Sequence, residues 1–99
     1  MQLTEKQRRH LRGLAHPLKP VTLVGNGGVS AGVVAETIRA LQDHELIKVR
    51  LPGLPREERD QALEDLAVRS DSALVGRIGH IAVLYRPRKD QPKILLPGT

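Results

Sequence analysis

The chain of 99 residues has no cysteine, phenylalanine or tryptophan, and a single tyrosine, Tyr85, is its only large aromatic residue. Without cysteine, a disulfide framework, cysteine-based zinc or iron–sulfur sites and thiol redox chemistry are excluded. With one tyrosine, modules that stack unpaired bases on aromatic platforms, such as RRM, OB-fold and cold-shock domains, are nearly excluded. The core has to be built from leucine, isoleucine and valine.

Long apolar runs are also missing. No stretch approaches the roughly 20 apolar residues that span a bilayer, and the N-terminus is charged where a signal peptide would be apolar. Hydrophobic residues make up 39% of the chain and charged residues 27%, an ordinary globular balance. These features predict a single soluble domain over residues 1–88 in the cytoplasm, with a proline-containing basic tail over residues 89–99 that is extended or loosely docked.

Positive charge is in excess. Sixteen Lys and Arg residues face eleven Asp and Glu residues, which gives a net charge of +5 and a pI near 10.2. This excess predicts attraction to polyanions, either nucleic acid or anionic lipid. Eleven of the sixteen cations are arginine, whose planar fork suits phosphate oxygens. Because the first helix lacks the Trp or Phe of interfacial helices, nucleic acid is preferred over a membrane.

The N-terminal half has the spacing of a strand–helix–strand unit preceded by a helix. Thr4 and Gln7 have the spacing of a capping box, and the helix that follows places three apolar residues on one stripe: Leu11, Leu14 and Ala15. Residues 21–24 form an apolar strand after two prolines, and Ser30 is the expected N-cap of a helix that ends near His44. The alternation in residues 45–51 predicts a half-buried strand, parallel to the first.

The C-terminal half predicts one more helix and a hairpin. Residues 56–70 place four apolar residues inward: Ala62, Leu63, Leu66 and Ala67. Residues 73–86 read as two strands with a tight turn near Gly79 and His80. The predicted fold is therefore α/β (α+β), two-layered, in the order α-β-α-β-α-β-β with a mixed four-stranded sheet.

A glycine loop, Gly25-Asn26-Gly27-Gly28, joins the first strand to the second helix. A Rossmann fingerprint fails because its third glycine position holds Ser30, and a P-loop fails because no lysine follows. What remains is a G-x-x-G loop at a helix N-terminus, where bare amides can meet a sugar-phosphate backbone as in the KH class. The alternative is a turn that only needs positive φ.

Other candidate sites are weaker. A second G-x-x-G, residues 76–79, lies in a strand and its turn, so hairpin geometry explains it. The histidines at 10, 16, 44 and 80 lie in different segments without metal-ligand spacing, and no catalytic triad or inward carboxylate pair can be placed. We therefore expect no catalytic residue, no metal and no cofactor. The basic surface beside the loop is predicted to comprise Arg8, Arg12 and Lys19.

Together, "LRGLAHPLKP", the G-x-x-G before a helix, "HELIKV" and "VLYRP" make the chain closely resemble the YhbY family of small bacterial proteins. These are stand-alone versions of the CRM domain (chloroplast RNA splicing and ribosome maturation). The resemblance implies a fold similar to the C-terminal domain of bacterial translation initiation factor three. It also implies RNA binding through Gly25, Asn26, Gly27 and Gly28 with the neighbouring basic surface, and association with precursors of the large ribosomal subunit.

The expected function is therefore that of a non-enzymatic, monomeric protein that binds ribosomal RNA during large-subunit assembly, with neither a membrane nor a small-molecule substrate as partner. An alternative is a basic interaction module for a ribosomal or acidic protein. A remote third is a nucleotide-dependent enzyme.

Overall fold

The computed structural model describes residues 2–25 and 27–98, which form three helices and four strands. In chain order they are α1 (Glu5–Ala15), β1 (Pro20–Leu23), α2 (Ala31–His44), β2 (Leu46–Arg50), α3 (Arg56–Arg69), β3 (Ala73–Ile78) and β4 (Ile81–Tyr85). The expected order α-β-α-β-α-β-β is confirmed. None of the described helices is both long and apolar enough to cross a membrane.

The strands form one mixed sheet in the order β1-β2-β4-β3. β1 runs parallel to β2, as the strand–helix–strand pattern predicts, and the β3–β4 hairpin is antiparallel. β2 also pairs antiparallel with β4, with Lys48 opposite Val83 and Arg50 opposite Ile81. The sheet is therefore mixed and four-stranded, with β1 and β3 at its edges.

Local capping chemistry fixes the starts of the first two helices. The hydroxyl of Thr4 accepts a hydrogen bond from the backbone N–H of Gln7, whose side chain accepts one from the N–H of Thr4 in return. Ser30 accepts a hydrogen bond from the N–H of Val33 at 3.2 Å. Both predicted N-caps are confirmed, because these side chains supply acceptors that the first helical turn lacks.

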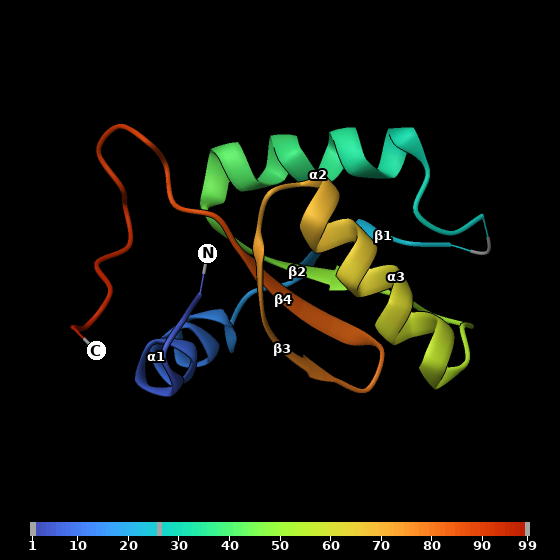
Figure 1. Cartoon of the computed structure of the whole chain (residues 1–99), viewed down its shortest axis with the longest axis horizontal. Coiled ribbons are helices and arrows are strands. Elements are labelled where there is room, and N and C mark those ends of the chain that lie inside the picture. The colour runs from blue at the N-terminus through green and yellow to red at the C-terminus, as the bar shows by residue number, and fades with distance from the viewer. Residues whose placement is uncertain (1, 26, 99) are drawn as a thin grey trace.

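The apolar core lies on both faces of the sheet. One cluster joins α2 and α3 to alternate residues of the central strands: Ile47, Val49, Ala82 and Leu84. A second cluster lies on the opposite face, where Leu11 and Ala15 of α1 pack on Leu46, Val75 and Tyr85. The molecule therefore has three layers where a two-layer arrangement was expected, because β2 and β4 carry apolar residues on both sides (Figure 1). Leu14, expected to point inward, is 42% exposed.

Residues 86–98, which follow β4, form no helix or strand but are fixed by one buried carboxylate. Glu45 has no exposed surface and a left-handed backbone with φ 63°, and its side chain accepts the backbone N–H groups of Arg88, Lys93 and Ile94 at 2.7 to 2.9 Å. Further along, the carbonyl of Pro97 accepts a hydrogen bond from Gln7 of α1. The C-terminal segment around Pro97 thus lies beside α1, as Figure 1 shows in red and blue.

Candidate nucleic-acid interface

The glycine loop is closed by short backbone contacts. The N–H of Gly28 donates to the carbonyl of Gly25 at 3.0 Å, and the N–H of Ser30 donates to the carbonyl of Gly28 at 3.1 Å. Gly28 has φ 72°, a left-handed conformation that favours glycine. Gly25 and Gly27 lie outside the left-handed region, so a strained turn does not explain them. Asn26 lies outside the described residues.

Internal packing does not explain these glycines either. A Cβ built at Gly25, Gly27 or Gly28 would meet no atom within 4 Å. Glycine is commonly found where another backbone or a ligand approaches closely. The bare backbone at Gly25 and Gly27 therefore leaves room for something outside the chain.

The loop leads into the N-terminus of α2, whose electrostatics favour an anion. The first turn of α2 contains no acidic residue that would offset the positive end of the helix dipole. Arg69 of α3 fixes the exit of the loop by donating to the carbonyl of Val29 at 2.8 Å. The loop is thus anchored at the point where it meets the helix.

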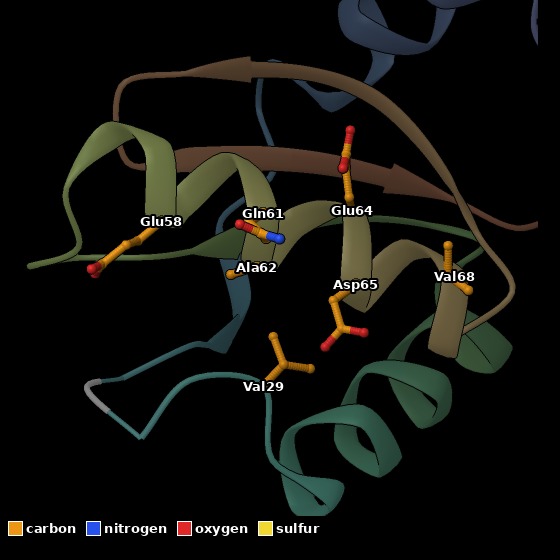
Figure 2. Close-up of a pocket in the computed structure, with 7 residues that line it drawn as sticks. All are labelled: Val29, Glu58, Gln61, Ala62, Glu64, Asp65 and Val68. Atoms are coloured by element: carbon orange, nitrogen blue, oxygen red, sulfur yellow. The ribbon is translucent and has the colours of Figure 1, made fainter.

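One side of the loop borders an acidic groove. A hollow of about 590 Å³ lies between Val29 and α3, and its acidic lining residues are Glu58, Glu64 and Asp65. Figure 2 shows the side chains of Val29 and Asp65 pointing into the same gap. A phosphate that approached from α3 would face these carboxylates. These carboxylates thus disfavour the approach of a polyanion from the α3 side.

The predicted cations on α1 have partners within the protein. Arg8 is half-buried and donates to the carbonyl of Leu74 in β3 at 2.8 Å, so it docks the helix on the sheet. Arg12 forms an exposed ion pair with Glu5 at 3.0 Å. The stem of Arg12 crosses β3 where Gly76 makes room, because a Cβ there would lie 3.2 Å from Cδ of Arg12.

Lys19 is exposed immediately before β1 and lines a shallow hollow along that strand together with Arg50, which sequence reasoning did not select, and with the carboxylate Glu36 of α2. The carbonyl of Arg50 accepts a hydrogen bond from the N–H of Val24 at 2.8 Å, next to the start of the loop. The hydroxyl of the buried Thr22 in the same hollow has no partner among the described residues. Arg50 is therefore the cation of the sheet next to the glycine loop.

The structure does not gather all predicted site residues at one point. The glycine loop and α1 lie at opposite ends of the view in Figure 1, which has the longest axis horizontal. Lys19 and the loop lie at the two ends of the short strand β1, whereas Arg8 and Arg12 lie over β3. The alternating pattern of residues 45–51 placed Lys48 and Arg50 on one face of a strand, and this was the available signal for the missed cations.

The second G-x-x-G, residues 76–79, is part of the β3–β4 hairpin. Gly79 has φ 58° in the turn, and its carbonyl accepts a hydrogen bond from Arg77 at 3.4 Å. Arg77 also pairs with Asp60 of α3 at 2.9 Å. Ile78 lies in the strand as expected but is 82% exposed, so its side chain does not support the core. Hairpin geometry explains this motif.

The four histidines are exposed and lie on separate segments of the described chain. Nδ1 of His80 lies 2.7 Å from Nη1 of Arg59, a contact between two surface groups. Among the described residues, no group of three or more His, Asp or Glu side chains is placed to hold a metal ion. These side chains give no chemistry to the candidate interface.

Comparison with known proteins identifies a matching domain family and several similar proteins. The CRS1 / YhbY (CRM) domain model matches residues 3–86. An RNA-binding protein of Haemophilus influenzae is 45% identical over 95 residues, which is 96% of this chain and 95% of the relative. YqeI of Bacillus subtilis, named a probable RNA-binding protein, is 41% identical and matches 96% of this chain and 99% of its own length.

A solved structure agrees with the fold. The solution structure of a hypothetical protein from Staphylococcus aureus, described as a candidate RNA-binding protein, matches with a TM-score of 0.84 at 35% identity. The match covers 97% of this chain and 100% of that chain. The similarity therefore extends over the sheet, the helices and the C-terminal segment together.

Proposed function

This chain belongs to the CRS1 / YhbY (CRM) domain family, and we propose that it is a non-enzymatic protein that binds RNA through the backbone of its glycine loop. The names of the relatives support RNA as the partner. The observation that carries the proposal is the bare backbone at Gly25 and Gly27, which neither φ nor internal packing requires. A sugar-phosphate backbone fits this gap and the uncompensated end of α2.

The distribution of charge supports the same partner. The chain carries a net charge of +5, yet the groove on the α3 side of the loop is acidic. On the β1 and β2 side the hollow along β1 holds two cations, Lys19 and Arg50, against one carboxylate, Glu36, which favours that side for phosphates. Arg12 contributes through an exposed ion pair, which is worth about 0 to 1 kcal/mol and can exchange for a phosphate. Arg8 acts mainly by positioning α1.

The RNA we propose is ribosomal RNA of the large-subunit precursor, bound by a monomer during assembly. Phosphate contacts position a protein but do not specify bases, so a domain with one tyrosine has to select the shape of a folded RNA. Precursor ribosomal RNA offers such shapes. The family resemblance, rather than the geometry of the site, supplies this choice among folded RNAs.

Substitution of the loop tests RNA binding. Gly27→Asp should place a carboxylate where phosphate is expected and weaken RNA binding by about 2 kcal/mol, roughly thirtyfold in Kd. The fold should be unchanged because Gly27 is exposed with open space around it. Val68→Asp on α3, at an exposed position, is the control with the same charge. Equal RNA affinity of the two variants in a fluorescence anisotropy titration would overturn the role of the loop.

A sucrose gradient tests the proposed target. The protein should sediment with particles at or just below the large subunit, leave them in high salt, and be nearly absent from polysomes. An even spread through free protein, small subunits and polysomes would mean that the basic surface binds polyanions in general.

A second candidate is a protein partner, which one apolar groove favours. This groove, of about 430 Å³, lies between α1, β1 and the C-terminal segment, and its apolar lining includes Leu14, Leu18, Val21 and Ile94. Complexes that survive RNase but fail when Leu18 is replaced by Asp would favour a ribosomal or acidic protein over RNA.

A further inference from the structure

The sheet face that carries α1 is only half covered. Residues of neighbouring strands form rows across it, and the row of Leu46, Tyr85 and Ala73 lies under α1 and the C-terminal segment. The next two rows are Lys48–Val83–Gly76 and Arg50–Ile81–Ile78. We call these six residues the open sheet face. None of them is a member of the buried clusters, although Val83 packs at the edge of the second one.

The open sheet face has an apolar floor. Val83 and Ile81 are half-buried, and Ile78 is 82% exposed. With Arg12 and Ala15 of α1 they line a groove of about 500 Å³. On the neighbouring edge strand, Leu23 is 55% exposed and pairs with Arg50. Exposed aliphatic side chains gathered in this way mark an interaction surface rather than scattered solvent-facing residues.

Cations border this floor. Lys48 donates one hydrogen bond, to the carbonyl of His16 at 3.0 Å, which leaves two of its three N–H donors. Arg50 is exposed at the end of β2, and Arg12 lies over Gly76. The acidic residue nearest on α1, Glu5, is paired with Arg12. The face is thus apolar in the middle, and its border carries the cations Arg12, Lys48 and Arg50, with the carboxylate Glu36 near Arg50.

The open sheet face also connects the two separated parts of the candidate interface. Arg12 lies at its α1 end, and Arg50 lies at the other end beside Leu23 and Val24, directly before the glycine loop. In Figure 1 the parallel strands β1 and β2 run from the left, where α1 lies, toward the loop end. A chain of phosphates held at Gly25 and Gly27 can therefore continue along β2 toward Arg12.

We propose that the open sheet face binds a single-stranded segment of the RNA, with bases lying on Val83, Ile81 and Ile78 and phosphates beside Lys48 and Arg50. This inference rests on the proposed RNA-binding function and extends it from the loop to the sheet. A duplex hides the flat faces of its bases and would leave the apolar floor against water, whereas unpaired bases cover it. Aliphatic contacts replace the aromatic stacking that this chain lacks, so binding should tolerate many base sequences.

Charge-matched substitutions at two exposed aliphatic residues test the proposal. Ile78, 82% exposed on the open sheet face, and Val68, 79% exposed on α3, are each replaced by Glu. Both variants lose the same net charge and should keep the fold, checked by urea unfolding. With a single-stranded RNA oligonucleotide, we expect Kd to rise about tenfold for Ile78→Glu and less than about twofold for Val68→Glu.

A second pair of variants distinguishes contacts to the bases from contacts to the phosphates. Ile81→Ala should weaken binding of the oligonucleotide about threefold and leave unchanged the binding of an abasic strand of equal length. Arg50→Gln should weaken both, whereas Arg39→Gln on α2, at an exposed position, should weaken neither by as much.

The outcomes distinguish this proposal from the proposed function. If Gly27→Asp weakens RNA binding but Ile78→Glu and Val68→Glu bind RNA with equal affinity, the role of the loop is supported and RNA binding by the open sheet face is overturned. If the wild-type protein binds no RNA, both the proposed function and the role of the open sheet face are overturned. If Ile78→Glu leaves RNA affinity unchanged and instead dissociates a dimer in analytical ultracentrifugation, the face is an interface between copies of this chain, which also overturns the proposal.

Discussion

Gly27 and Gly28 are adjacent, but different physical requirements act on them. Gly28 has φ 72°, a conformation that costs an L-residue about 1 kcal/mol or more. Gly27 lies outside that region, and a Cβ built on it would meet no atom within 4 Å. We expect Gly28→Ala to lower the free energy of unfolding by about 1 kcal/mol and Gly27→Ala to leave it unchanged. Urea denaturation of both variants measures this. A loss of stability in Gly27→Ala would mean that the fold itself requires that glycine.

Tyr85 is a single-residue reporter of the core between α1 and the sheet. Burial, and then the nearby charge of Glu45, raise the pKa of its phenol above the ordinary value. The unfolded chain therefore loses the phenolic proton first, above about pH 10, and stability should fall as the pH rises toward the folded-state pKa. Tyr85→Phe should remove this component of the pH dependence. Identical alkaline stability profiles for the two proteins would contradict it.

Glu45 shows how one residue can order a whole element. Its carboxylate accepts three backbone N–H groups from residues 88–94, while Arg88 donates to the carbonyls of Gln42 and Asp43 at the end of α2. Glu45→Ala should lower the free energy of unfolding by about 3 kcal/mol, because three partly buried backbone donors lose their charged acceptor. It should also release the C-terminal segment to proteolysis. Glu36→Ala, at an exposed position on α2, is the control and should change little.

Local sequence signals account for the elements but not for how they cover the sheet. The capping residues Thr4 and Ser30 predict both helix starts because they act over three residues. The partner of Arg8, Leu74, lies 66 residues away, and no local pattern reports such a contact. For the same reason no local pattern predicts the hydrogen bonds of Glu45 to residues 88–94. The alternation around Lys48 and Arg50 gave their shared face, but not that α1 leaves that face half open.

At the scale of the whole molecule, charge is divided between two sides. The groove on the α3 side of the glycine loop is lined by carboxylates, and the β1 and β2 side carries the cations Lys19, Lys48 and Arg50 with one carboxylate, Glu36. If these cations neutralise phosphates, log affinity should fall linearly with log salt, with a slope of about −0.7 per contact on single strands. Arg50→Gln should remove one phosphate contact and so make the slope less negative by about 0.7. Affinity that does not change between low and moderate salt would remove the electrostatic account.

The central claim is that RNA lies on the glycine loop and the β1 and β2 side of this domain. Photocrosslinking of the protein to bound RNA, followed by mass spectrometry of the linked peptides, tests it most directly. We predict crosslinks in residues 19–30 and 46–50, extending to residues 76–83, with almost none in α3. Crosslinks concentrated in α3, with the glycine loop unlabelled, would contradict the claim.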